Sequence, residues 1–118
     1  LSPGQPSCYY HGEDDQEDFL VLSGECLLVI EGEERRLKQW DFVHCPAWTE
    51  HVFVGAGGRP CVLLGVGSRR TREGVYPASP AAQRHGAAVS KETRSPREAY
   101  AEIPPDVDAG YRAGWLPE

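Results

Sequence analysis

Two histidines and a run of acidic residues are the side chains in this sequence whose types and spacing could carry out chemistry. His11 and Glu13 stand two residues apart, and acidic residues continue to Asp18. Side chains at positions i and i+2 of a strand face the same side, so His11 and Glu13 are expected to point together. His51 begins a later apolar run and could approach from the opposite side. Imidazole nitrogens with carboxylate oxygens suit Zn, Fe, Mn or Ni, and two histidines with one carboxylate also form the site of non-haem iron oxygenases.

The same residues have a simpler interpretation. Five of the six residues from Glu13 to Asp18 are acidic, and acidic runs are usually solvated turns. A single histidine near the end of a strand is more often a surface residue than a ligand. Spacing alone leaves both interpretations open.

The elements that would position these side chains are short strands. Apolar runs of strand length alternate with turn signals, of which Glu31-Gly32-Glu33 is the expected tip of a hairpin. Such regular spacing predicts an all-β sandwich or barrel. No stretch before residue 68 has helical periodicity, which argues against a parallel α/β fold. The apolar runs are Phe19–Leu22, Cys26–Ile30, Phe42–Cys45, His51–Val54 and Cys61–Val66.

These residues resemble the cupin superfamily, whose first motif is G-x5-H-x-H-x3,4-E-x6-G. His11, Glu17 and Gly24 match the histidine, the glutamate and the closing glycine of that motif in spacing. Glu13 stands where the second histidine would be, and Gly4 lies one residue too far upstream.

The second cupin motif is G-x5-P-x-G-x2-H-x3-N. Pro46 and His51 match it in spacing. Trp40 and Trp48 replace its two glycines, and Gly55 replaces its asparagine. The resemblance covers roughly residues 1–67.

The resemblance implies a double-stranded β-helix, or cupin jelly-roll barrel, that holds one divalent metal ion near one mouth. The ligand set in this sequence would be His11, Glu13, Glu17 and His51. A second carboxylate in place of a histidine hardens the site, which favours Zn, Mn or Fe(II) over soft ions. Alternatively, Glu13 or Glu17 does not ligate and serves as a general base beside the metal.

Three aromatic side chains could line the cavity of such a barrel: Tyr9, Trp48 and Phe53. The alternative is that they are core and rim aromatics. For His44 we expect a structural role, with a bond to a neighbouring carbonyl.

We divide the chain into a cupin barrel, residues 1–68, and a C-terminal extension, residues 69–118. Ser79-Pro80 and Ser95-Pro96 each carry the start signal of a short helix, with serine as N-cap and proline at the first position. The extension is otherwise irregular and is expected to pack on the barrel or on a partner subunit, which predicts a homodimer. Its aromatic residues, Tyr76, Tyr100, Tyr111 and Trp115, would make the contacts. The arginines at 69, 70 and 72 are interpreted as a solvated loop.

Composition excludes several classes of function. The 118 residues carry a net charge of −6 with a pI near 5.2, which argues against a nucleic-acid partner. No apolar run approaches the ~20 residues needed to span a bilayer, so no membrane association is expected. No signal peptide is visible. None of the four cysteines forms a C-x-x-C pair, and buried thiols in a reducing cytoplasm are the expectation.

The function predicted from the sequence is a small metal-dependent enzyme of dioxygenase, isomerase or decarboxylase type. Its substrate would be a small polar or carboxylated molecule. The alternative is a non-catalytic module that binds a small ligand with a structural metal. A third hypothesis, a metal-free barrel used like a sugar-nucleotide epimerase, leaves the His/Glu spacing unexplained.

Overall fold

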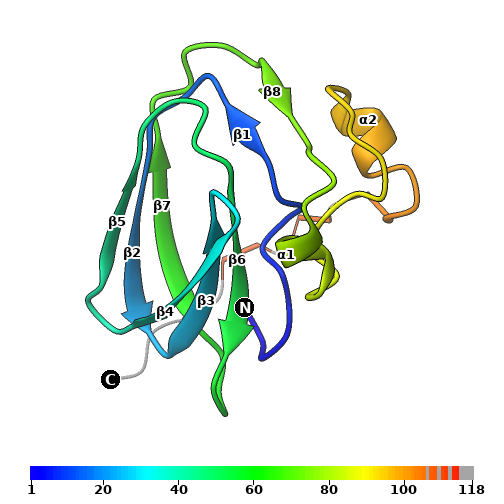
Figure 1. Ribbon diagram of the computed structural model, residues 1–118. Helices are drawn as coiled ribbons and strands as arrows, with labels where there is room; N and C mark the ends of the chain where they lie inside the picture. Colours follow the sequence, from blue (N-terminus) through cyan, green and yellow to red (C-terminus); the bar gives the residue numbers. More distant parts are fainter. Residues whose placement is uncertain (106, 109, 112, 115–118) are drawn as a thin grey trace.

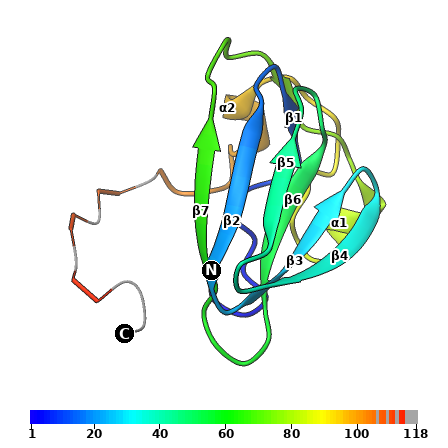
Figure 2. The same cartoon turned by 90° about the vertical axis from the view of Figure 1, so that its left-hand side faces the viewer.

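Two three-stranded antiparallel sheets pack face to face in the computed structural model, which describes residues 1–105, 107–108, 110–111 and 113–114. One sheet has the order β5-β2-β7 and the other the order β4-β3-β6 (Figure 1). Figure 2 shows β7, β2 and β5 side by side, with β6, β3 and β4 behind them to the right. The strands are β2 (Glu17–Ser23), β3 (Glu25–Ile30), β4 (Glu33–Lys38), β5 (Phe42–Cys45), β6 (His51–Ala56) and β7 (Val62–Gly67). The all-β prediction is confirmed.

A core fills the space between the two sheets. Val21 of β2 meets Leu28 of β3 and Phe53 of β6, and each side chain is at most 2% exposed. Alternate residues of both sheets contribute to this layer, as expected when strands present every second side chain to one face. The buried thiols of Cys26 and Cys61 belong to the same core and are free.

The hairpin between β3 and β4 has the predicted tip. Glu31 and Gly32 have φ angles of 48° and 79°, and the paired strands meet at Ile30 and Glu33. Positive φ at both central residues matches the twist of a two-residue hairpin. β4 is the edge of its sheet, and its exposed charged side chains discourage pairing with another chain.

The C-terminal extension covers the outer face of the β4-β3-β6 sheet. Helix α1 (Pro80–Gln83) begins at Ser79, whose hydroxyl accepts a hydrogen bond from the Ala82 N–H. Figure 1 shows α1 beside β6 and β3. Its residues Ala81 and Ala82 join Val52 and Val54 of β6 in a second buried cluster. β6 is therefore buried on both faces. This packing holds in place the strand whose first residue is His51.

Helix α2 (Pro96–Ala99) also begins where the sequence predicts. The Ser95 hydroxyl accepts from the Glu98 N–H. Glu98 does not reach back to the Ser95 N–H, because that donor bonds to the Thr93 hydroxyl, which in turn donates to the Glu98 carboxylate. The prediction of an irregular extension with short helices is confirmed.

A third, two-stranded sheet joins the extension to the start of the barrel. β1 (Gly12–Glu13) pairs with β8 (Gly74–Val75). In Figure 1 this pair lies at the upper end of the sandwich, with α2 to its right. The sequence predicts His11 and Glu13 on one strand, which corresponds to β1, but it does not indicate β8, since two residues carry no periodicity. Among the described residues, no helix is long and apolar enough to cross a membrane.

Candidate metal centre

Three of the four predicted ligands come together at one end of the sandwich. His11 lies just before β1, Glu17 begins β2 and His51 begins β6. Each offers one ligand atom, and these atoms lie within 4.8 Å of one another. His51 Nε2 lies 3.2 Å from the Glu17 carboxylate. Their role as metal ligands stays a prediction.

Backbone hydrogen bonds hold the two histidines side by side. The His11 N–H donates to the His51 carbonyl at 3.2 Å, and the His51 N–H donates to the His11 carbonyl at 2.9 Å. Their ring centroids are 5.1 Å apart. This reciprocal pair joins the segment before β1 directly to β6, so the two imidazoles share one rigid frame.

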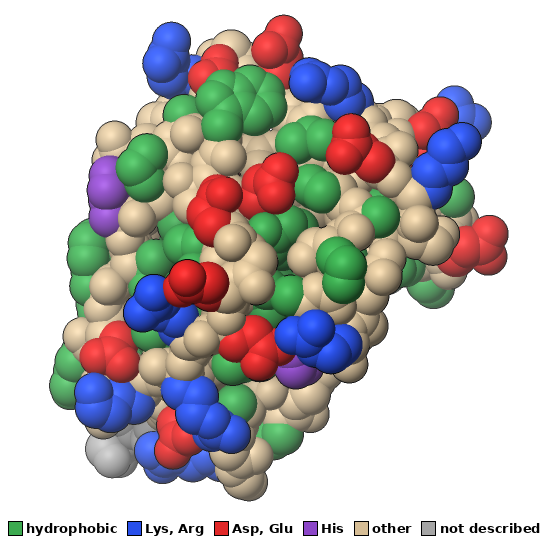
Figure 3. Space-filling view, in the orientation of Figure 1, with side chains coloured by type: hydrophobic (Ala, Val, Ile, Leu, Met, Phe, Trp, Pro, Cys, Tyr) green, Lys and Arg blue, Asp and Glu red, His purple; other side chains and the backbone are tan. Residues whose placement is uncertain are grey.

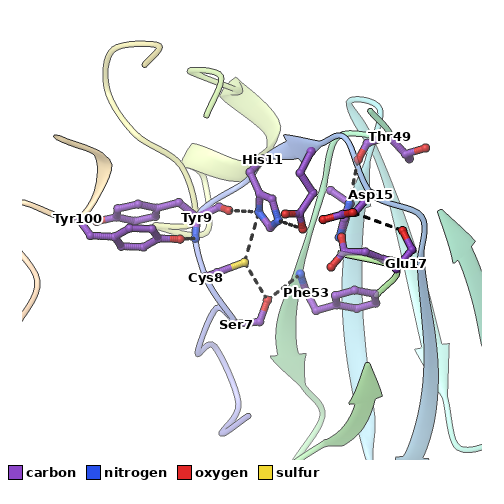
Figure 4. A network of polar contacts seen from close by, with 12 residues as sticks. Ser7, Cys8, Tyr9, His11, Asp15, Glu17, Thr49, Phe53 and Tyr100 are labelled. Atoms are coloured by element: carbon purple, nitrogen blue, oxygen red, sulfur yellow. Dashed lines mark hydrogen bonds and ion pairs between the residues drawn. The ribbon is translucent and has the colours of Figure 1, made fainter. Parts of the chain in front are cut away.

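The ring nitrogens have a defined orientation. Nδ1 of His11 lies 2.8 Å from the Tyr9 carbonyl, and Nδ1 of His51 lies 2.9 Å from the Thr49 carbonyl. A carbonyl can only accept, so each Nδ1 donates and each neutral ring keeps its lone pair on Nε2. His11 Nε2 lies 3.5 Å from the Glu13 carboxylate, and His51 Nε2 lies 3.2 Å from the Glu17 carboxylate. Figure 4 shows the His11 ring with its contacts to Tyr9 and Cys8. Such backbone partners orient histidine ligands in metal sites.

The two glutamates of the site differ electrostatically. For Glu17, the hydrogen bond and charge of His51 outweigh burial and lower the pKa of the carboxyl. For Glu13, burial and the neighbouring Glu17 charge raise the pKa. The Glu13 carboxylate lies 3.5 Å from His11 Nε2 but outside the three-residue group. Glu17 is therefore the charged partner, and Glu13 is the carboxyl that takes up a proton more readily.

His11 also binds its proton tightly. Burial opposes protonation, but the contacts with Cys8 and the Tyr9 carbonyl, together with the Glu13 charge, raise the pKa of His11 to about 9. A metal ion must displace that proton, which makes metal affinity depend on pH. The donor set fits a divalent ion of borderline hardness, since it combines two imidazoles with at least one carboxylate.

A cavity of about 760 Å³ opens beside this group. His11, Glu13 and Glu17 contribute to its lining, together with Phe19 and Tyr76. His51 lies behind them and is 3% exposed. The candidate ligands therefore reach a space large enough for a small molecule.

The C-terminal extension also contributes to the cavity lining. Arg69, Arg70 and Arg72 line it from the loop between β7 and β8, and Arg94 lines it from the segment before α2. The first three arginines are exposed, as expected of a solvated loop, and they also line the cavity. Their spacing, three arginines in four residues directly after the last long strand, was the available signal.

The three aromatic residues expected along the cavity lie elsewhere, and its lining contains none of them. Tyr9 stacks on Tyr100 with ring centroids 5.1 Å apart, and the Tyr9 N–H donates to the Tyr100 hydroxyl. Phe53 belongs to the core between the sheets. The Trp48 side chain is 42% exposed, and the Trp48 backbone N–H donates to the Glu13 carbonyl at 2.7 Å. Trp48 thus positions the Glu13 backbone from outside the cavity.

Of the remaining predicted residues, only Tyr76 belongs to the described cavity lining. His44 points outward from β5, and its Nδ1 lies 2.6 Å from the Asp18 carboxylate rather than near the expected carbonyl. Tyr76 and Tyr100 pack together with their ring centroids 5.6 Å apart. Tyr111 is 94% exposed, and Trp115 lies outside the described residues.

The backbone explains the unusual residues of the second motif. Trp40 and Trp48, at the two glycine positions, have φ angles of 73° and 68°, where glycine is ordinarily preferred. Gly24 has a φ of 77°, and a Cβ there would lie 2.5 Å from the Pro60 carbonyl oxygen. Gly24 thus keeps the closing turn of the first motif. In the second motif, Trp40 and Trp48 keep the positive φ of the two turns although the glycines are replaced.

The family model of the cupin domain matches residues 1–67. This chain belongs to the cupin family. Cupin domains often bind metal ions, and the cluster of His11, Glu17 and His51 occupies the motif positions described above. The predicted double-stranded β-helix fold is confirmed.

Solved structures of other cupins resemble this one. A putative sugar phosphate isomerase from Acidithiobacillus ferrooxidans is 30% identical with a TM-score of 0.57, and the match covers 64% of this chain and 49% of that one. A cupin-superfamily sugar phosphate isomerase from Silicibacter pomeroyi is 29% identical with a TM-score of 0.56 and the same coverage. The polyketide cyclase RemF from Streptomyces resistomycificus is 25% identical with a TM-score of 0.52, covering 57% of this chain and 48% of that one.

This cupin spans about half the length of the first two of these proteins. The comparison with curated proteins finds no match.

Proposed function

We propose that this cupin is a metal-dependent enzyme of isomerase type that acts on a small polar molecule in the cavity. One observation carries the proposal: three nitrogen and oxygen donors within 4.8 Å of one another stand beside a cavity of about 760 Å³. Two similar structures named sugar phosphate isomerases, at 30% and 29% identity, support the isomerase type over the dioxygenase and decarboxylase types.

His11, Glu17 and His51 would hold the ion, with both imidazoles fixed through Nδ1. A divalent ion at this position supplies Lewis-acid chemistry, which polarises a carbonyl or hydroxyl oxygen. Three protein ligands leave coordination positions for a substrate, whereas a closed set of four is typical of structural sites.

Glu13 is suited to move a proton. Its carboxyl lines the cavity, and burial together with the Glu17 charge raises its pKa, which brings a carboxylate nearer to the working range of a general base. In an isomerisation, the Glu13 carboxylate would take a proton from the carbon beside the substrate carbonyl. It would return this proton to the former carbonyl carbon, while the proton of the neighbouring hydroxyl passes to the former carbonyl oxygen. The carbonyl then moves by one position and the atoms balance.

The second candidate is a non-catalytic module with a structural metal. The position of Glu13, 3.5 Å from His11 Nε2, favours it, because a small rotation could make this carboxylate the fourth ligand. The ion would then be closed to substrate, and the cavity would at most bind a ligand.

Metal content tests the site first. Elemental analysis of purified protein, before and after reconstitution with Zn, Mn, Fe(II) or Ni, should give about one equivalent per chain. His51→Ala should lose it. His44→Ala is the matched control, since this histidine lies on the outer face and should leave the metal content unchanged. Unchanged content in His51→Ala would refute the site.

Proton exchange tests the reaction. Sugars and sugar phosphates in D2O should incorporate deuterium beside the carbonyl, measured by NMR, when the metal-loaded protein is present. Glu13→Gln should abolish exchange while weakening metal binding less than Glu17→Gln does. Stoichiometric metal without exchange on any substrate of this class would favour the binding module.

A further inference from the structure

Charged side chains of both signs line the cavity. The carboxylates are those of Glu13, Asp15, Glu17 and Glu73, while Arg69, Arg70 and Arg72 come from the loop after β7. Arg94 adds a fourth guanidinium. Four of the twelve basic residues thus line one cavity in a chain whose net charge is −6. A generally basic surface does not explain this concentration.

The four guanidinium groups have no carboxylate partner within the described part of the chain. Three arginines elsewhere are paired, Arg35 with Glu33 at 2.7 Å, Arg36 with Glu25 at 3.5 Å and Arg84 with Glu34 at 3.3 Å. Arg59 and Arg97 form no ion pair within the described residues. No such ion pair forms at the cavity arginines, although acidic residues are close by in the chain. Their donors remain available to a ligand, and the planar guanidinium fits the paired oxygens of phosphate or carboxylate.

The nearby acidic residues instead hold the backbone and hydroxyl groups of the loop. Asp15, 6% exposed, accepts hydrogen bonds from the Arg70 N–H and from the Ser68 hydroxyl. The Asp14 carboxylate accepts from the Thr71 hydroxyl at 3.3 Å, and the Asp14 N–H donates to the Glu73 carbonyl at 3.0 Å. The backbone of residues 68–73 is therefore held in place before any ligand arrives, which reduces the entropy lost on binding.

From this arrangement we infer that the arginine loop (residues 69–72), with Arg94, binds an anionic group of the substrate, either a phosphate monoester or a carboxylate. The hydroxyl or carbonyl end of the same molecule would face His11, Glu13 and Glu17. Only the placement of the hydroxyl or carbonyl end at the candidate metal centre rests on the proposed function. The anion site at the arginine loop does not. Figure 3 shows basic and acidic side chains side by side at the upper end of the molecule, where this loop lies in Figure 1.

Titration calorimetry with ligands that share one carbon frame tests the inference. Glucose 6-phosphate, gluconate and glucose differ in the charged group, and inorganic phosphate probes the anion alone. At least one of the two six-carbon anions should bind about tenfold or more tightly than glucose. Binding of the phosphate ester with inorganic phosphate identifies a phosphate site, and binding of gluconate identifies a carboxylate site.

Arg70→Ala/Arg72→Ala should weaken binding of the preferred anion by about tenfold or more. Arg35→Ala/Arg36→Ala removes the same charge from the edge strand β4 and should change affinity by less than about twofold. Arg70→Lys/Arg72→Lys keeps the charge without the planar fork and should fall between them. This variant also tests the site should the alanine variant fail to fold.

The inference is overturned if neither anion binds up to about 10 mM, if glucose binds as tightly, or if both loop variants bind like the unaltered protein. Repeating the titrations on chelator-treated protein separates the two proposals. Arginine-dependent binding that survives metal removal supports the anion site even if no reaction is found. Full metal loading without anion binding supports the metal centre and refutes the anion site.

Discussion

The carboxylate of Asp15 binds the arginine loop to the segment between Glu13 and Glu17, and its removal is expected to damage both stability and ligand binding. It is almost fully buried and accepts from the Arg70 N–H and the Ser68 hydroxyl. A hydrogen bond to a charged group contributes about 1.5–3 kcal/mol. Both donors lie in exposed residues and can bond to water once the carboxylate is gone. Asp15→Ala should therefore lower the free energy of unfolding by about 1–3 kcal/mol in total.

The matched control is Asp14→Ala. The Asp14 carboxylate accepts one exposed hydrogen bond of 3.3 Å, from the Thr71 hydroxyl. Its removal should therefore lower the free energy of unfolding by less than about 1 kcal/mol. Asp15→Asn keeps an acceptor without the charge and should lie between the two. Urea unfolding followed by circular dichroism measures each value, provided that the transition is two-state.

Ligand affinity provides the second measurement on the same variants. If Asp15 pre-organises the arginine loop, Asp15→Ala should weaken binding of the preferred anion, although the residue adds negative charge to the cavity lining. Removal of a carboxylate that acted only through its charge would instead strengthen anion binding. Unchanged stability together with stronger binding in Asp15→Ala would therefore refute the reasoning.

Three further predictions can be tested directly. Because the raised pKa of His11 is about 9, protons compete with the metal, and Zn or Mn affinity measured by competition titration should rise with pH until about 9 and then level off; an affinity independent of pH would contradict this. Gly24→Ala should cost at least about 2 kcal/mol in urea unfolding, because it adds strain at positive φ and a clash with Pro60, whereas Trp40→Gly should change stability by less than about 1 kcal/mol. The predicted homodimer should persist at micromolar concentration in size-exclusion chromatography with light scattering, and a monomer would contradict it.

The long strands could be predicted from the sequence because their apolar residues carry the signal themselves. β2, β3, β5 and β6 each contain one of the predicted apolar runs, and β7 overlaps the run Cys61–Val66. β4 is different, since its residues are nearly all charged, and only its pairing with β3 defines it as a strand. A pattern of burial cannot identify an edge strand whose side chains are solvated.

The gathering of His11, Glu17 and His51 could be anticipated, whereas the orientation of their rings could not. Their approach follows from strand ends that meet at one edge of the sandwich. The direction of each Nε2 depends on the carbonyl two residues earlier in the chain. Those carbonyl directions are set by local backbone angles that spacing does not reveal.

The contribution of the C-terminal extension to the cavity could not be predicted because it depends on contacts between distant parts of the chain. β8 pairs with β1 across about sixty residues, and the Tyr9 N–H reaches the Tyr100 hydroxyl across ninety-one. The division at residue 68 separated the two parts of the cavity lining on composition alone. The Asp14–Asp15 turn beside the candidate ligands, however, directly holds residues 68–73. The acidic run is therefore neither simply a solvated turn nor wholly a ligand set, since Glu13 and Glu17 face the cavity while Asp14 and Asp15 hold the loop that carries the opposite charge.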